Sequence, residues 1–549
     1  MKIIKYIFSA AIGILLTTAC SDFLDSNPIT SLVESNYYKT EADAGTALVG
    51  CYDGLQNIWV KNDHTPPVTS NIMSDECFGG TGTGDGFGFQ LIDEFDLDRS
   101  PSDVNMYNSV WASKYKALYR CNMLLSKLDQ IEWTSDDNRN RVEAEARFIR
   151  AYIYFEMGKL LGNIPLVLTP LTPEEANVPQ ATAEELYAAI EEDLLFASEH
   201  AALKNEPWTV EWATVSDGRV TVYAAKSMLA RVFLFYTGYH NKTTLPNGTD
   251  KAKVTEYLLD VYTSGHGLVD NYNELWPAAS SVRDATAEPI LLSTTYVGEG
   301  NKETVWAVKF NSSGTWGNFD GFASMRMIGL RSGSVKSFGN TVYGDGSWGA
   351  CPVTPTFVST WPGTDPRKAW SVMDVANEGM TMSDKHDQRE YTGYFPKKYI
   401  CLGNGTQNIY AAQSLDFQWN QYTDLLVIRY ADVLLMLSEL TEDAKYMNEV
   451  RDRVNLSAIA YSVDALREER KYELAFEGIR YWDLLRYDHS LQYAADAVSF
   501  SGTVADGAKA TVTKTIDGQR LIDCKGLSQI PNTQIGLSNG VLKQNPGWE

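Results

Sequence analysis

The stretch EERKYELAFEGIRYWDLLRY, Glu468 to Tyr487, carries the clearest fold signal in the chain. Its apolar residues recur at three- and four-residue steps, at Ala475, Ile479, Trp482 and Leu485. Such spacing marks one face of a helix, and it predicts a single helix over about residues 463–487. Acidic and basic residues are interleaved along it, and we interpret them as ion pairs on the helix surface, such as Arg470 with Glu473. This interpretation is favoured over a pair of catalytic carboxylates.

Helical patterns continue on the N-terminal side of this stretch. Residues 425–440 (LLVIRYADVLLMLSEL) are apolar on more than one face, which is typical of a packed central helix. Further helices are predicted over about residues 111–128, 142–160, 183–200 and 222–236. Thr182 and Glu185 form a capping-box pattern at the start of the third of these. We therefore expect a mainly α protein with a scaffold of tetratricopeptide-like helix pairs, although no clean 34-residue repeat is visible.

The middle of the chain, residues 265–421, differs in composition. It is rich in Gly, Ser, Thr and aromatic residues, and it holds seven of the 14 tryptophans in under a third of the chain. Short strands are predicted near residues 289–296 and 304–310. We therefore expect three regions: an N-terminal helical part (20–264), an irregular variable part (265–421), and a C-terminal helical part (422–549) that forms one unit with the first.

The N-terminus has the features of an export signal. Lys2 and Lys5 flank the start of an apolar run that ends at Leu16, and small residues then lead to Cys20. This order is that of a secretory signal, and the run is about half of the roughly 20 apolar residues that cross a bilayer. The cysteine resembles that of a bacterial lipobox, although Leu16 lies one position earlier than the usual leucine. We expect residues 1–19 to be removed and Cys20 to carry lipid, which would be the only membrane anchor.

Charge content limits the classes of partner, and cysteine spacing indicates the state of the thiols. The formal net charge is −23, and −25 without the two signal lysines. Because no Lys/Arg-rich run occurs, nucleic acid and anionic membrane surfaces are poor candidates as partners. The six other cysteines show no CxxC spacing, and we expect mostly free, buried thiols; they are Cys51, Cys77, Cys121, Cys351, Cys401 and Cys524.

The common catalytic and cofactor motifs are missing from the sequence. The glycine-rich stretch 79–88 contains neither GxGxxG nor GxxxxGK[ST], and the six histidines form no HExxH. No GxSxG is present either. We expect no cofactor, although Asp96, Asp98 and Asp103 are spaced loosely enough for a structural Ca²⁺. A glycosidase needs only two carboxylates about 5–10 Å apart, so that activity stays open.

Several tryptophans are candidates for a sugar-binding surface. Trp316 and Trp348 lie in the glycine-rich contexts SSGTWGNFDG and YGDGSWGA, where no periodicity predicts burial. A flat ring on an ordered loop can stack on the CH face of a sugar, while neighbouring polar side chains bind the hydroxyls. Trp306 and Trp361 are further candidates for this platform. Most other tryptophans are expected in the core.

These segments resemble the SusD/RagB family of surface lipoproteins from Bacteroidetes-type bacteria. The resemblance rests on the stretch 468–487, on IRYADVLLMLSE before it, on the ending IPNTQIGLSNGVLKQNPGW, on CSDFLDSNP after the signal, and on AEARFIRAYIYFEMGKLLGNIPLV. It implies four tetratricopeptide-like helix pairs, with excursions that form the ligand face. The middle third matches no family pattern, as a variable ligand-facing part would.

The resemblance also implies a function without catalysis. Family members capture glycans outside the outer membrane and deliver them to a TonB-dependent porter of the SusC type. Asp22 and Asp25 after the lipidated cysteine resemble the surface-export signal of such lipoproteins. The tripeptide Ser74-Asp75-Glu76 matches a recurring family motif near the ligand, so Asp75 and Glu76 are candidate ligand-binding residues, with loop capping as the alternative. A peptide-capturing RagB-like protein and a surface glycoside hydrolase remain the alternative functions.

Overall fold

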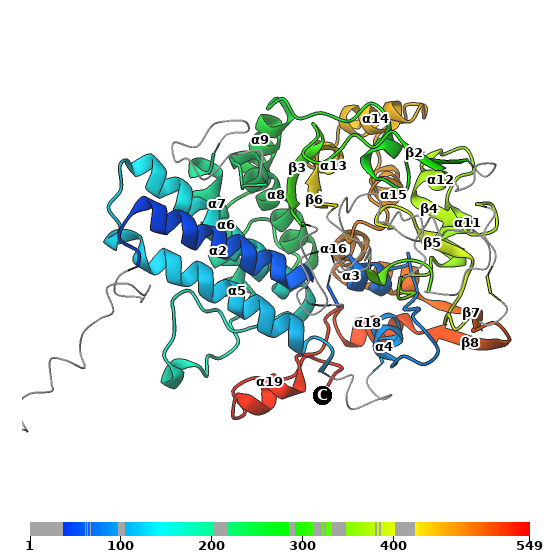
Figure 1. Cartoon of the computed structure of the whole chain (residues 1–549), viewed down its shortest axis with the longest axis horizontal. Coiled ribbons are helices and arrows are strands. Elements are labelled where there is room, and N and C mark those ends of the chain that lie inside the picture. Colours follow the sequence, from blue (N-terminus) through cyan, green and yellow to red (C-terminus); the bar gives the residue numbers. More distant parts are fainter. Residues whose placement is uncertain are drawn as a thin grey trace, which may run out of the picture.

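The computed structural model shows a mainly α protein. It describes residues 37–60, 62, 64–65, 67–96, 105–202, 218–284, 291–311, 321–322, 326–331, 347–378, 382–383, 386–400 and 423–549. The long helices gather on one side of the molecule, and short helices and strands gather on the other (Figure 1). The predicted fold class, a helical scaffold with an irregular excursion, is thereby confirmed. Among the described residues, no helix has the length and apolarity needed to cross a membrane.

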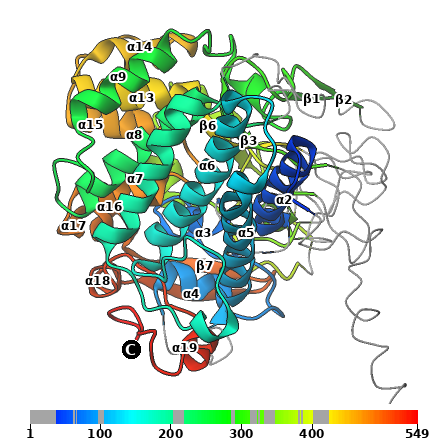
Figure 2. The same cartoon turned by 90° about the vertical axis from the view of Figure 1, so that its left-hand side faces the viewer.

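The helical side is a layer of long helices that pack against one another in chain order (Figure 2). These helices are α2 (Glu41–Val60), α5 (Asn108–Lys127), α6 (Asp136–Leu161), α7 (Ala183–His200), α8 (Val222–Tyr239) and α9 (Lys251–Tyr262). The predicted capping box of α7 is present: the Thr182 hydroxyl accepts from the Glu185 N–H at 3.2 Å, and the Glu185 carboxylate accepts from the Thr182 N–H at 2.8 Å. The local sequence thus determines where this helix begins.

The C-terminal part inserts between the helical layer and the irregular side. It contains α13 (Tyr430–Thr441), α14 (Ala444–Arg453), α15 (Val463–Glu473), α16 (Arg480–Tyr487), α17 (Gln492–Val498), α18 (Gly518–Asp523) and α19 (Asn532–Leu537). Helix α13 packs on α9, and α16 packs on α8. This part therefore connects the two sides of the molecule.

The irregular side is built from short elements. Its helices are α3 (Val68–Met73), α4 (Gly88–Glu94), α11 (Pro355–Thr360) and α12 (Arg367–Ser371). A 3₁₀ turn occurs at Tyr272–Leu275, and two more, Leu128–Gln130 and Pro173–Glu175, follow α5 and α6 in the helical layer. The described strands are β1 (Ser281–Asp284), β2 (Leu291–Thr294), β3 (Thr304–Val308), β4 (Val372–Asp374), β5 (Tyr394–Pro396), β6 (Leu425–Arg429), β7 (Phe500–Asp506) and β8 (Ala510–Ile516). They form four antiparallel pairs, β1–β2, β3–β6, β4–β5 and β7–β8. The predicted strands at 289–296 and 304–310 correspond to β2 and β3.

The prediction of one helix over residues 425–440 is wrong in its first turn. Residues 425–429 form β6, which pairs with β3, and α13 begins only at Tyr430. All five residues of β6 are buried. A short apolar run of this kind fits a buried strand as well as a buried helix, and the pairing with β3, more than a hundred residues earlier, decides between them.

The prediction of one helix over residues 463–487 is also wrong, because the chain turns between α15 and α16. Phe476 and Gly478 adopt left-handed backbone angles, with φ of 62° and 76°. The turn is held from outside: the Glu76 side chain accepts from the Phe476 N–H at 3.0 Å, and the side-chain amide oxygen of Asn71 accepts from the Gly478 N–H at 3.1 Å. The helical spacing of the sequence continues across this turn, so spacing alone could not reveal it.

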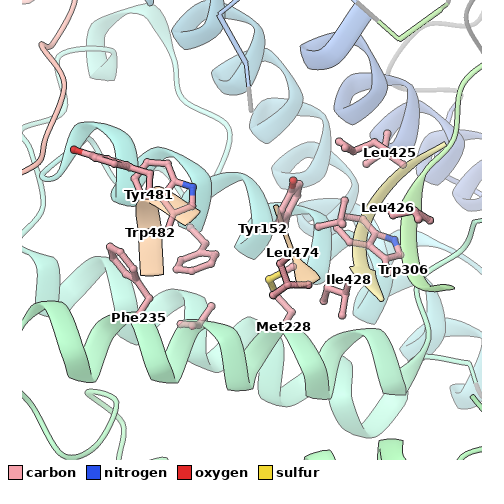
Figure 3. Packing of buried hydrophobic residues seen from close by; sticks show 14 of the residues in the cluster. Tyr152, Met228, Phe235, Trp306, Leu425, Leu426, Ile428, Leu474, Tyr481 and Trp482 are labelled. Atoms are coloured by element: carbon pink, nitrogen blue, oxygen red, sulfur yellow. The ribbon is translucent and has the colours of Figure 1, made fainter. Parts of the chain in front are cut away.

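One hydrophobic core joins the helical layer to the C-terminal part (Figure 3). Tyr152 of α6 lies beside Trp306 of β3, with ring centroids 4.9 Å apart, and Trp482 of α16 packs against Phe235 with ring centroids 6.3 Å apart. The five described cysteines outside the N-terminus, Cys51, Cys77, Cys121, Cys351 and Cys524, are free and buried, as predicted, and Cys401 lies outside the described residues.

The charged residues of α15 and its turn are buried in an ion network, contrary to the expectation of surface pairs. At its centre, the Arg429 guanidinium at the end of β6 bonds to Glu473 at 2.6 Å, to Glu477 at 2.7 Å and to Glu303 at 2.8 Å. All four side chains are at most 1 % exposed. Arg470, predicted to pair with Glu473, instead reaches Asp432 and Asp483.

Further cations complete this network from other elements. Glu473 also binds Arg367 of α12 at 3.0 Å and Arg453 of α14, and Glu477 binds Lys398 at 2.6 Å. Burial alone would raise the pKa of Glu473, but the surrounding arginines hold that pKa below its usual range. The network therefore links β3, β6, α12, α14 and α15 through a single carboxylate and its neighbours.

Replacing the central carboxylate should destabilise the whole fold. We expect Glu473→Gln to lower the free energy of unfolding by about 3–5 kcal/mol, because Arg367, Arg429 and Arg453 would keep their buried charges without this partner. Glu468→Gln, the same change at an exposed position of the same helix, should stay within about 0.5 kcal/mol of the wild type. Chemical denaturation of both variants measures the free energy of unfolding. Equal denaturation midpoints for the two variants would contradict the prediction.

The turn between α15 and α16 should make stability depend on pH through Glu76. Burial raises the pKa of this carboxyl to about 8, so the folded state holds the proton more tightly than the unfolded state. The free energy of unfolding should then fall as pH rises from about 4.5 to about 8. Glutamine mimics the protonated form, and Glu76→Gln should gain about 1–3 kcal/mol over the wild type above pH 8 and little at pH 5.

Thermal melts of the wild type and the Glu76→Gln variant at pH 5 and pH 8.5 measure this difference. Glu468→Gln serves as the matched control, since it makes the same substitution at an exposed position of α15. An equal shift of the Glu76→Gln melting temperature at both pH values would show that this carboxyl is ionised in the fold.

Candidate functional site

Two of the predicted platform tryptophans lie in the core. Trp306 and Trp361 are each 2 % exposed. Trp306 is enclosed by the ring edges of Phe148 and Tyr152 at 4.7 and 4.9 Å (Figure 3), and Trp361 stacks on Tyr472 at 4.8 Å. A ring enclosed in this way has no face for a sugar, so the structure removes both from the platform. Trp316 and the lipidation candidate Cys20 lie outside the described residues.

The candidate ligand residues of the Ser-Asp-Glu motif bind the scaffold instead. The Asp75 carboxylate accepts from the Arg480 guanidinium at 2.8 and 3.0 Å, and Lys471 lies 3.9 Å away. Glu76 is fully buried against the turn at Phe476. Loop capping is the alternative for this motif; Glu76 accepts from a backbone N–H of the turn, whereas Asp75 forms an ion pair, and a ligand-binding role for either residue stays a prediction. The motif contacts the C-terminal helices, and the glycine-rich stretch follows it directly in the sequence.

Trp348 is the predicted platform ring that the structure exposes. Its side chain is 38 % exposed, and the Arg331 guanidinium lies over the ring, 5.2 Å from its centroid. Arg331 is fixed in turn by the Asp85 carboxylate at 2.9 Å and by the Trp348 carbonyl at 3.3 Å. The ring is thus presented at the surface with a cation held against it.

Phe87 is a second exposed ring, which the sequence interpretation missed. It is 44 % exposed, and the Arg389 guanidinium lies 4.3 Å from its centroid. Arg389 is held by the carbonyls of Thr83 at 2.7 Å and Gly86 at 3.0 Å. A signal was available, because Phe87 lies in the stretch FGGTGTGDGFGF, a glycine-rich context like that of Trp348. We refer to Phe87, Trp348, Arg331 and Arg389 together as the aromatic–arginine platform.

Backbone pairing holds the two loops of the platform together. The Thr81 N–H donates to the Gly349 carbonyl at 2.7 Å, the Gln388 amide donates to the same carbonyl at 2.7 Å, and the Arg389 N–H donates to the Thr81 carbonyl at 2.8 Å. At Gly80, with φ of 75°, a Cβ atom would lie 2.2 Å from the Gly349 carbonyl oxygen. Glycine is required there, because no side chain fits between the loops.

A buried carboxylate cluster supports the same loop. The carboxylates of Asp93 and Glu390 accept from the N–H groups of Gly79 and Gly80, each at 2.8 Å. With Glu94 they form a group that could hold a metal ion, but Lys514 Nζ lies among them at 2.9, 2.6 and 3.0 Å from Asp93, Glu390 and Glu94. The ammonium group thus fills the position that a cation would take.

The residues of this cluster differ from those for which a Ca²⁺ site was predicted. Burial raises the pKa of Asp93, while Asp93, Glu390 and Glu94 together raise the pKa of Lys514 above its usual range. The Lys514 ammonium thus offsets part of the negative charge of the cluster. Of the residues considered for Ca²⁺, Asp98 and Asp103 lie outside the described residues, and that site stays a prediction.

The platform can bind but has few means of catalysis among its described groups. Exposed aromatic faces offer apolar contact, and the two guanidinium groups offer fixed hydrogen-bond donors. This combination suits a ligand with alternating CH faces and hydroxyl groups. The Asp85 carboxylate is engaged by Arg331 and by the Gly82 N–H at 2.8 Å, and the Asp387 carboxylate lies 3.6 Å from Arg331.

Comparison with known proteins identifies the family. A model of the SusD family matches residues 356–548, and a second model, described as starch-binding associating with outer membrane, matches residues 22–234. The chain is 23 % identical to the SusD-like protein P25 of Formosa agariphila, over 90 % of this chain and 91 % of that protein. It is 22 % identical to a SusD-like protein of Bacteroides ovatus, over 86 % and 80 % of the two chains.

Solved structures agree with this assignment. A laminarin binding SusD-like protein superposes with a TM-score of 0.72 and 25 % identity, over 93 % of this chain and all of the other. The surface glycan-binding protein A from Bacteroides thetaiotaomicron, in complex with laminarihexaose, gives 0.71 and 22 % identity, over 92 % of this chain and all of the other. The two family models together cover both helical parts of the fold, and the chain belongs to the SusD-like family.

Proposed function

We propose that this protein is a glycan-binding lipoprotein of the cell surface that passes oligosaccharide, chemically unchanged, to a SusC-like TonB-dependent porter. The observation that carries the proposal is the aromatic–arginine platform, with Phe87 and Trp348 exposed and an arginine held against each ring. Both rings lie on loops that the scaffold fixes, so the binding surface exists before the ligand arrives. A preformed surface avoids the cost of ordering loops on binding.

The chemistry of the platform favours a sugar over a peptide. Phenyl and indole rings stack on the CH faces of pyranose rings, and the arginines can donate to the hydroxyl groups. One similar structure is a laminarin binding SusD-like protein, and another is a surface glycan-binding protein in complex with laminarihexaose. A glucan of that kind is therefore the first ligand to test, and binding without hydrolysis is expected.

The location follows from the N-terminus and the family. One family model is described as associating with the outer membrane. Lipid on Cys20, with Asp22 and Asp25 directing the anchored protein to the outer face, would leave the folded domain on a tether next to a porter. The tether would let the platform approach the porter and release the glycan there.

Removing the platform rings should weaken glycan binding. We expect Trp348→Ala and Phe87→Ala each to reduce affinity for laminarin oligosaccharides about tenfold or more, since exposed aromatic anchors dominate many interfaces. Tyr119→Ala is the matched control, because Tyr119 is a 51 % exposed ring on α5 of the helical side. Isothermal titration calorimetry and affinity electrophoresis on a polysaccharide panel measure the effect.

Three results would contradict this proposal in different ways. Unchanged migration of the wild type on every glycan would remove glycan binding. Binding of peptides that Trp348→Ala leaves intact would favour the peptide-capturing alternative. Appearance of reducing ends from an oligosaccharide, lost on replacing a carboxylate pair, would identify a glycoside hydrolase.

The anchor has its own test. We expect Cys20→Ala to abolish incorporation of labelled palmitate and to release the protein from the outer-membrane fraction, because the cysteine thiol is the acceptor of the lipid. Cys524→Ala, at a buried thiol of the fold, should leave both readouts unchanged. Retention of label by the Cys20→Ala variant would place the lipid elsewhere.

A further inference from the structure

A large groove lies outside the platform, where the helical layer meets the C-terminal segment. Its volume is about 950 Å³, and no platform residue lines it. The groove is formed by the end of α6, the start of α7, the end of α8, and three stretches that follow α16, α18 and α19. Helices α6, α7 and α8 supply one wall, and the three C-terminal stretches are turns and irregular segments that follow their helices.

The groove differs in charge from the rest of the chain. The whole sequence has 70 acidic and 47 basic residues, yet the lining holds no Asp or Glu and includes Lys525, Lys543, His240 and His489. Lys543 Nζ donates to the Gly540 carbonyl at 2.9 Å, and neither lysine forms an ion pair with a described carboxylate. The two ammonium groups therefore keep their charge available to a ligand.

Two acids next to the C-terminal lining stretches, Asp488 and Asp523, are engaged in local hydrogen bonds. The Asp488 carboxylate accepts from the Ser490 N–H at 3.0 Å and from the Ser490 hydroxyl at 2.5 Å. The Asp523 carboxylate accepts from the Gln519 amide at 2.9 Å. Because both acids are occupied by these local hydrogen bonds and neither lines the groove, they do not replace an anionic ligand there.

Uncharged hydrogen-bonding groups lie beside these cations. Tyr187 is 2 % exposed, and its hydroxyl has no hydrogen-bond partner among the described residues. The His240 ring lies 5.6 Å from the Tyr187 ring, and burial together with Lys242 lowers the pKa of His240 to about 4. Its imidazole is neutral at pH 7 and can both donate and accept. The Tyr239 hydroxyl fixes Lys525 by donating to its carbonyl at 2.6 Å.

We propose that this groove is a second ligand site, which binds a saccharide carrying carboxylate or sulfate groups. Its volume is within the range of sites that enclose small ligands. The lysines would attract the anionic group, and the imidazole and the unpartnered hydroxyl would bind sugar hydroxyls, as buried polar groups require. The site is independent of the platform, so the inference does not rest on the proposed function.

Calorimetry with trigalacturonic acid and with the uncharged galactose trimer tests the site. The acidic trimer should bind the wild type, with an affinity that falls as NaCl is raised, and the neutral trimer should bind more weakly. The double variant Lys525→Ala/Lys543→Ala should lose about tenfold or more in affinity for the acidic trimer, as expected for two charge-assisted contacts. Lys116→Ala/Lys251→Ala changes the net charge equally at exposed positions outside the groove and should bind as the wild type does.

The outcomes separate this site from the platform. Loss of acidic-trimer binding in Trp348→Ala, with Lys525→Ala/Lys543→Ala unaffected, would place the anionic sugar on the platform and overturn the proposal. The proposal would also be overturned if neither trigalacturonic acid nor a sulfated disaccharide bound the wild type. A short polyglutamate that bound as tightly as trigalacturonic acid would overturn it too, because it would show charge attraction without a preference for sugar. Binding of laminarin oligosaccharides should be the same in the lysine variant and the wild type.

Discussion

The interaction of Arg429 with Glu473 and Glu477 is the constraint on which the rest of the fold depends. Charged groups lose much hydration energy when they are buried, and a buried pair repays this only if every remaining hydrogen-bonding position is satisfied. Here the partners come from β3, β6, α12, α14 and α15, and each carboxylate has more than one cation. These elements cannot separate or shift in register without leaving a charge unpaired, so the network specifies one arrangement of the C-terminal part.

The same stretch of sequence also positions the binding surface. Asp75 pairs with Arg480, and Glu76 holds the turn at Phe476. The chain that leaves this motif runs directly into the glycine-rich loop, whose N–H groups at Gly79 and Gly80 are fixed by Asp93 and Glu390. The exposed Phe87 ring at the end of that loop is therefore supported by the Asp75–Arg480 pair and by the carboxylates around Lys514. Loops without such support would have to be ordered by the ligand itself, at a cost in affinity.

The sequence predicts those features that local patterns determine. The limits of α7 follow from its capping box and its spacing, and the fold class follows from several helices of this kind. Trp306 and Trp361 could not be told from Trp348, because their burial is decided by contacts with Phe148 and Tyr472, far away in the sequence. The broken helix at Phe476 was hidden for the same reason, since its hydrogen-bond partners lie about 400 residues earlier.

A TM-score of 0.72 at 25 % identity implies that few interactions need to be shared for this fold to form. A buried ion network is suited to be one of these shared interactions. A buried charge without its partner is costly, whereas many apolar residues can be exchanged for others of equal volume. The surface loops are then free to differ, because they contribute little to the core. Phe87 and Trp348 lie on such loops, which are held by backbone bonds, by buried carboxylates and by two arginines. Under the proposed function, ligand preference would be set by the few side chains that these loops present, above a scaffold that the C-terminal helices keep fixed.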